Sequence, residues 1–100
     1  MFTVIKTKVF DAWIDGLRDR KGRAILVRRL MALELGHFGD VKQVERGILE
    51  MRMHFGPGYR VYLTQRGKQL IVLLCGGHKG SQKRDIAKAV ELAEKLEIEP

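Results

Sequence analysis

The stretch ILEMRMHFGPGYRVYLTQ, residues 48–65, decides the fold because it reads as two β-strands joined by a tight turn. Gly56, Pro57 and Gly58 between the strands supply the turn. Apolar and polar side chains alternate along both strands, the pattern of a sheet with one covered face. The apolar members are Leu49, Met51, Met53, Phe55, Val61 and Leu63, and the polar members are Glu50, Arg52, His54, Arg60, Tyr62 and Thr64. We therefore expect an antiparallel hairpin.

The same alternation restricts the register of the hairpin. A slip by one residue would place the Met51 face against the Arg60 face and bury charge. The remaining registers gather two arginines, a histidine, a tyrosine and a carboxylate onto one patch. Such a patch is either a solvated sheet face with cross-strand ion pairs or a functional site, and the strand pattern alone leaves both open.

The segment after the hairpin predicts a strand and a closing helix. QLIVLLC, residues 69–75, is apolar almost throughout, as expected for a central strand covered on both faces. Residues 81–97 form an amphipathic pattern with Ser81 as a plausible N-cap. The apolar stripe of this helix consists of Ile86, Ala89, Val90, Ala93 and Leu96.

The segment before the hairpin predicts a short strand and two helices. FTVI, residues 2–5, is β-prone, and the hydrophobic period becomes helical after it. Gly36 is the expected stop of the second helix. The expected apolar positions are Val9, Phe10, Trp13, Ile14 and Leu17 in the first helix, and Ala24, Val27, Leu30, Met31 and Leu35 in the second.

The order of these elements is β, α, α, three or four strands, then α. This order predicts a single α+β domain over residues 1–100. We expect a small antiparallel sheet meander with two N-terminal helices and one C-terminal helix, the helices lying on one side of the sheet.

The charge balance points to an anionic partner. Nineteen Lys and Arg oppose twelve Asp and Glu, which gives a net charge of +7. Such a field attracts nucleic acid or an acidic protein. The single cysteine, Cys75, excludes a disulfide within the chain, and we expect it to be buried and inert. Without a long apolar run or a signal-peptide pattern, we expect a cytoplasmic protein with no membrane contact.

The loop CGGHKGSQKR, residues 75–84, is a second candidate for function. It leaves the apolar strand and enters the last helix, and helix N-termini attract anions. Its glycines permit close approach of the backbone to a ligand, and His78 and Lys79 stand between them. The spacing does not fit a nucleotide-binding P-loop.

Residues 35–63, LGHFGDVKQVERGILEMRMHFGPGYRVYL, and residues 73–89, LLCGGHKGSQKRDIAKA, resemble the RelE/ParE toxin superfamily. More narrowly, they resemble its phage-derived addiction module killer protein branch, which is HigB-like. The resemblance implies a RelE-like fold and the toxin half of a type II toxin–antitoxin system. Its partner would be a small helix-turn-helix antitoxin, bound in a hetero-oligomer.

The resemblance also implies a target. Many RelE-like members cleave mRNA on the ribosome without a metal, so we expect an mRNA endoribonuclease that arrests growth. ParE-like members instead inhibit DNA gyrase on a similar fold, and a non-catalytic gyrase inhibitor remains the alternative. The sequence contains no His, Cys, Asp and Glu set at convincing metal spacing, and we expect no cofactor.

Site residues follow from the resemblance position by position. Arg60 matches the arginine of the Gly-Tyr-Arg motif, which contacts the scissile phosphate, and Arg52 matches a basic residue on the preceding strand. His78 or Lys79 would serve the leaving group as the acid. For the base, the chemistry leaves Glu50 or His54 open. Tyr62 would either stack on an RNA base or pack against a helix. The expected catalytic residues are thus Arg60, Glu50, His78 and Lys79, and the expected RNA-binding residues are Arg52, His54 and Tyr62.

Overall fold

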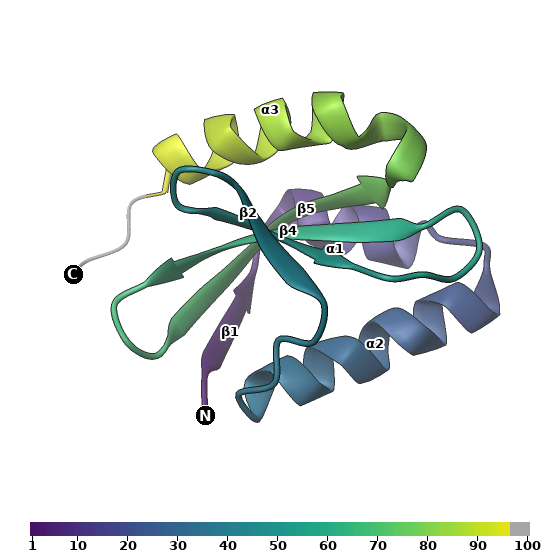
Figure 1. Cartoon of the computed structure of the whole chain (residues 1–100), viewed down its shortest axis with the longest axis horizontal. Helices are drawn as coiled ribbons and strands as arrows, with labels where there is room; N and C mark the ends of the chain where they lie inside the picture. Colours follow the sequence, from purple (N-terminus) through teal and green to yellow (C-terminus); the bar gives the residue numbers. More distant parts are fainter. Residues whose placement is uncertain (97–100) are drawn as a thin grey trace.

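The computed structural model describes residues 1–96, which form a five-stranded sheet with helices on both faces (Figure 1). The elements are β1 Thr3–Lys6, α1 Lys8–Asp15, α2 Arg20–Glu34, β2 Val41–Glu45, β3 Ile48–Arg52, β4 Tyr59–Arg66, β5 Leu70–His78, a 3₁₀ turn at Lys79–Ser81 and α3 Gln82–Glu94. The expected α+β class and element order are therefore confirmed. Glu97, the last residue of the expected final helix, lies outside the described residues.

The sheet has the strand order β1-β5-β4-β3-β2. Strands β2 to β5 form the expected antiparallel meander, but β1 runs parallel to β5, with Thr3 opposite Leu70. The sheet is consequently mixed, and the expectation of a purely antiparallel sheet is wrong at this edge. Strand β1 covers the open edge of β5, which would otherwise present unpaired backbone groups.

The hairpin has one of the registers that the alternation allows. Glu50 lies opposite Tyr62, and Arg52 lies opposite Arg60. The turn depends on glycine, because Gly56 and Gly58 have φ angles of +57° and +77°. The polar patch expected from the sequence is therefore assembled on β3 and β4.

Helices cover both faces of the sheet, contrary to the expectation that all lie on one side. α1 and α2 pack on one face around Phe10, Leu26 and Leu33, while α3 packs on the other with Ala89 against Tyr62. In Figure 1, α3 lies above the sheet and α2 below it. A strand face that carries polar residues is thus covered by a second layer.

The expected apolar stripe of α2 lies mostly on the wrong face of the helix. Of its five members only Leu30 is buried, whereas Val27, Met31 and Leu35 are 43%, 62% and 61% exposed. The buried face is instead Gly22, Leu26, Leu30 and Leu33. Close packing fixes this phase, since a Cβ on Gly22 would lie 2.5 Å from the Tyr59 ring. In α1, Phe10 and Ile14 are buried as expected, but Val9 is exposed.

Glycines at the end of β5 allow helices to approach from both sides. A Cβ on Gly76 would lie 2.3 Å from the Trp13 ring of α1, and one on Gly77 would lie 1.8 Å from the Asp85 carboxylate of α3. Cys75 is buried as expected, and burial raises its thiol pKa to about 12. No helix within residues 1–96 is long and apolar enough to cross a membrane.

Candidate functional site

A pocket of about 420 Å³ opens where the hairpin turn meets the start of α3. Three elements contribute basic groups to it: Arg52 ends β3, Arg60 is on β4 and Lys79 is in the 3₁₀ turn. The complete lining is Arg52, Met53, His54, Phe55, Gly56, Pro57, Gly58, Arg60, Lys79 and Gln82. Four of the seven candidate residues from the sequence therefore line one pocket.

The guanidinium of Arg60 is hydrogen-bonded through one of its three nitrogens, and its buried Nε forms an ion pair without a hydrogen bond. Its Nη1 donates to the carbonyl oxygens of Gly58 at 3.0 Å and Tyr59 at 3.2 Å, and Nε lies 3.9 Å from Glu50 Oε1. Nη2 makes no hydrogen bond to any described residue and is not among the buried unpartnered atoms. Although Arg60 is only 6% exposed, this one nitrogen is left for a ligand in the pocket.

Glu50 lies behind Arg60 and is fully buried. Its Oε2 accepts hydrogen bonds from the Tyr62 hydroxyl and from Gln82 Nε2, both at 2.9 Å. Its Oε1 has no hydrogen-bond partner and faces Arg60 as an ion pair. At this separation the attraction is about 4 kcal/mol for an effective dielectric constant of ~20, which offsets part of the cost of burying both charges.

Tyr62 is a core residue in this structure and not a stacking platform. It is fully buried under α3, and burial together with its hydrogen bond to Glu50 raises the pKa of its hydroxyl. Of the two roles left open for Tyr62, packing against a helix is the one observed. The polar hairpin patch is thereby divided: Glu50 and Tyr62 are covered, while Arg52 and His54 remain at the pocket.

A carboxylate outside the hairpin organises the pocket rim. Asp40 Oδ1 accepts from Arg52 Nη2 at 2.9 Å, and Asp40 Oδ2 lies 2.5 Å from His54 Nε2. The hydrogen bond from Arg52, followed by the one from His54, lowers the pKa of Asp40. The same contact with Asp40 raises the pKa of Arg52. These contacts fix two side chains that are partly or largely exposed.

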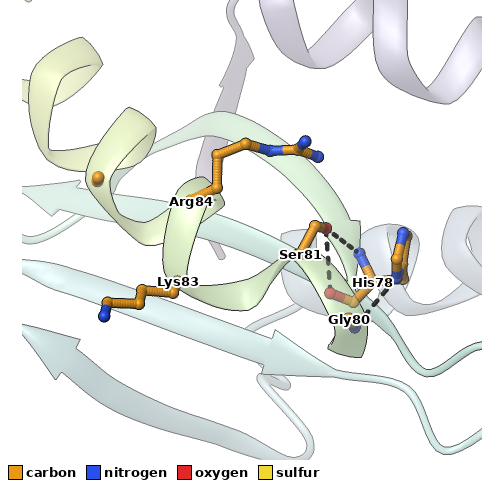
Figure 2. Close-up of a pocket in the computed structure, with 6 residues that line it drawn as sticks. His78, Gly80, Ser81, Lys83 and Arg84 are labelled. Carbon is orange, nitrogen blue, oxygen red and sulfur yellow. Dashed lines mark hydrogen bonds between the residues drawn. The ribbon is translucent and has the colours of Figure 1, made fainter.

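His78 and Lys79 are neighbours in sequence but line different pockets. Lys79 faces the pocket of Arg60, and its backbone N–H donates to Pro57 O at 3.4 Å. His78 lines an adjoining pocket of about 650 Å³ with Ser81, Lys83 and Arg84 (Figure 2). Its Nδ1 accepts from the Gly80 N–H at 3.0 Å, so the ring caps the 3₁₀ turn. His78 is therefore not brought together with Arg52 and Arg60.

Figure 2 also shows how the side chains of the adjoining pocket diverge. Lys83 points to the opposite side of the helix from Arg84, and His78 lies beyond Ser81. The Ser81 hydroxyl accepts from the His78 N–H at 3.2 Å, and its single proton is shared between the Asp85 carboxylate at 2.5 Å and His78 O at 3.2 Å. The polar side chains of the adjoining pocket are therefore spread over the 3₁₀ turn and the first turn of α3.

Asp40 and Gln82 belong to the site and were not among the expected residues. Pairing of β2 with β3 places Val41 opposite Met51, and Asp40 O accepts from the Arg52 N–H at 2.9 Å. This register could have been inferred from the Arg46-Gly47 turn between the two strands. Gln82 is the first residue of α3, immediately after the glycine-rich loop.

Comparison with known proteins gives one close relative of unknown activity. No family model matches the chain. An uncharacterized protein of Haemophilus influenzae is 43% identical over 90 residues, which span 90% of this chain and 91% of the relative. The chain therefore belongs to the same family as this Haemophilus influenzae protein.

Proposed function

We propose that this protein is a cytoplasmic mRNA endoribonuclease of the RelE/ParE superfamily, with a RelE-like fold, and the toxin half of a type II toxin–antitoxin system. The observation that supports it best is the convergence of Arg52, Arg60 and Lys79 from three separate elements on one pocket beside His54. Cations gathered in this way suit a phosphodiester whose negative charge grows during cleavage.

In the proposed mechanism, Arg60 and Arg52 bind the phosphate. The free Nη2 of Arg60 is pre-oriented, because the carbonyl oxygens of Gly58 and Tyr59 hold Nη1. A donor that is already fixed needs no reorganisation as charge develops on the phosphate oxygens. The Arg60–Glu50 contact gives Glu50 a positioning role behind the arginine.

Of the two candidate bases, His54 fits the pocket. The His54 side chain is 72% exposed and lines the pocket, whereas Glu50 is fully buried. In the proposed reaction His54 takes the proton of the 2′-hydroxyl, and the 2′-oxygen bonds to phosphorus. The bond from phosphorus to the 5′-oxygen breaks, and Lys79 donates a proton to that oxygen. The products are a 2′,3′-cyclic phosphate and a 5′-hydroxyl.

The proposed substrate is mRNA in the ribosome. The pocket is formed by a hairpin turn and a short loop, and no element among residues 1–96 encloses it as a channel for a long strand of RNA. The ribosome would hold the mRNA in an extended conformation, which the pocket alone does not impose. The net charge of +7 favours approach to such an RNA-rich surface.

The proposed antitoxin has a candidate docking surface on α2. Val27, Met31 and Leu35 form an exposed apolar stripe on the side opposite to the buried face, and Arg20 and Arg28 flank it. A helix that is apolar on two sides is normally covered on both. The flanking arginines favour an acidic amphipathic segment of the antitoxin over a second copy of this basic chain.

Induced expression in a bacterial host tests the function. Wild type should arrest growth and produce new mRNA ends at ribosome-occupied codons in primer extension. Arg60→Ala should abolish both effects while retaining the circular dichroism spectrum of wild type, and Arg46→Ala, in the exposed turn between β2 and β3, should behave as wild type. Relaxed plasmid DNA together with intact mRNA would contradict this proposal and support the gyrase inhibitor instead.

A further inference from the structure

We infer that Asp40 is the positioning residue of His54, fixing its ring so that Nδ1 is the nitrogen that accepts the proton; the catalytic consequence rests on the proposed function. Asp40 lies just before β2, and His54 follows β3. The two side chains meet through Asp40 Oδ2 and His54 Nε2 at 2.5 Å. A carboxylate accepts and never donates when ionised, so the proton of this contact is on Nε2.

This contact determines which nitrogen of the His54 ring can act as a base. A neutral imidazole carries one proton, and with that proton on Nε2 the lone pair of Nδ1 is free to act as a base. The carboxylate also stabilises the imidazolium that forms when Nδ1 takes the 2′-hydroxyl proton. Because the His54 side chain is 72% exposed, little else restricts its orientation.

Asp40 can orient His54 because its own position is fixed. Its Oδ1 accepts from Arg52 Nη2 at 2.9 Å, and its carbonyl oxygen accepts from the Arg52 backbone N–H at 2.9 Å. Arg29 of α2 secures the surrounding backbone by donating to Arg52 O at 2.9 Å and Phe38 O at 3.0 Å. Gly39, next to Asp40, has a φ angle of +68°, a conformation that favours glycine, and a Cβ there would lie 2.7 Å from Arg29 Nη2.

The charges around Asp40 keep it ionised at neutral pH. Arg52 and His54 contact the carboxylate directly, and Arg29 lies behind its backbone. Arg60 and Lys79 line the same pocket as Arg52 and His54. These neighbours are all cationic or become so on protonation, which agrees with the lowered pKa of Asp40.

Nitrogen NMR of the His54 ring in the full-length protein tests the inference without requiring activity. In wild type, at a pH at which the ring is neutral, the ¹⁵N shifts should show a proton on Nε2 and an unprotonated Nδ1. Asp40→Asn should give a mixture of the two tautomers, whereas Asp15→Asn, which removes the exposed carboxylate paired with Arg23, should leave the ring unchanged. An Nδ1-protonated ring in wild type, or the same tautomer in Asp40→Asn, would overturn the inference.

Single-turnover cleavage of ribosome-bound mRNA tests the consequence. Asp40→Asn should slow the chemical step by about tenfold to hundredfold, since a positioned base contributes ~10²–10⁴ and the untethered ring retains part of this. Asp40→Glu should recover part of the rate. A cleavage rate of Asp40→Asn within twofold of wild type would refute the catalytic role. A wild type that cleaves no RNA would refute the proposed function, and the NMR result would then decide the Asp40–His54 pair.

Discussion

Replacing Arg60 by lysine tests whether the shape of the guanidinium matters as well as its charge. The structure assigns three tasks to this side chain: Nη1 bonds to backbone carbonyls, Nε faces Glu50 and Nη2 is left for the phosphate. A lysine ammonium has one nitrogen and cannot perform all three tasks at once. Arg60→Lys should therefore keep the charge opposite Glu50 but lose the pre-oriented donor.

The expected loss follows from that missing donor. Removal of one fixed donor to a developing anion typically slows catalysis by about 10²–10³-fold, or ~3–4 kcal/mol in activation free energy. The free energy of unfolding should fall by only about 2 kcal/mol, roughly the value of one charge-assisted hydrogen bond. Most of the effect should consequently appear in the rate of cleavage and not in stability.

Single-turnover cleavage by purified protein on ribosomes loaded with a defined mRNA measures this loss. Arg46→Lys, an exposed arginine in the turn between β2 and β3, is the matched control and should retain the wild-type rate. Urea denaturation of all three proteins separates catalysis from folding. A folded Arg60→Lys protein that cleaves within threefold of wild type would refute the role assigned to the guanidinium.

Three further predictions concern buried or paired groups. Glu50→Gln should lower the free energy of unfolding by about 3 kcal/mol in urea denaturation, because it leaves Arg60 buried without its counter-charge; an unchanged midpoint would contradict this pairing. Hydrogen bonds from the Gly22 N–H and the Tyr59 hydroxyl lower the pKa of Asp19 below its ordinary value of 3.8. Asp19 should therefore stabilise the fold above pH ~4 and lose that contribution as the pH falls through its lowered folded pKa. Asp19→Asn should consequently lose less stability than wild type on acidification. An equal loss in both proteins would contradict this role of Asp19. Cys75, with its pKa raised to about 12, should react with a thiol reagent at pH 8 only as fast as the protein unfolds, and rapid labelling of native protein would show that the thiol is accessible.

Alternation along the strands was enough to predict the hairpin. Keeping charge away from the Met51 face limited the register to a few pairings, and the observed one, Glu50 with Tyr62 and Arg52 with Arg60, is among them. The apolar run 69–75 likewise predicted a strand buried on both faces, and residues 71–75 of it are buried. These features could be predicted because each depends on residues close together in the chain.

Features that depend on a second layer could not be predicted in the same way. A polar residue on a strand normally predicts a solvent-exposed face, yet α3 covers Glu50 and Tyr62, and Glu50 Oε2 accepts hydrogen bonds from Tyr62 and Gln82. The phase of α2 depends on the contact of Gly22 with Tyr59, a residue far away in sequence. Apolar periodicity alone therefore favoured Val27 and Met31, which are exposed.

The basic residues of the candidate site could be predicted from the sequence, but the contacts that position them could not. Arg52, Arg60 and Lys79 were expected together and share one pocket. His78 was grouped with Lys79 because the two are adjacent, but its ring turns back to cap the Gly80 N–H. Asp40 was absent from the expected site, because its position depends on how β2 pairs with β3.

The end groups of the RNA products test the central claim most directly. Purified protein is incubated with ribosomes carrying a defined mRNA, and both ends at each cleavage site are identified chemically. Attack by the 2′-oxygen predicts a 2′,3′-cyclic phosphate and a 5′-hydroxyl, with no product from Arg60→Ala. Intact mRNA, or a 5′-phosphate produced by attack of water, would contradict the account.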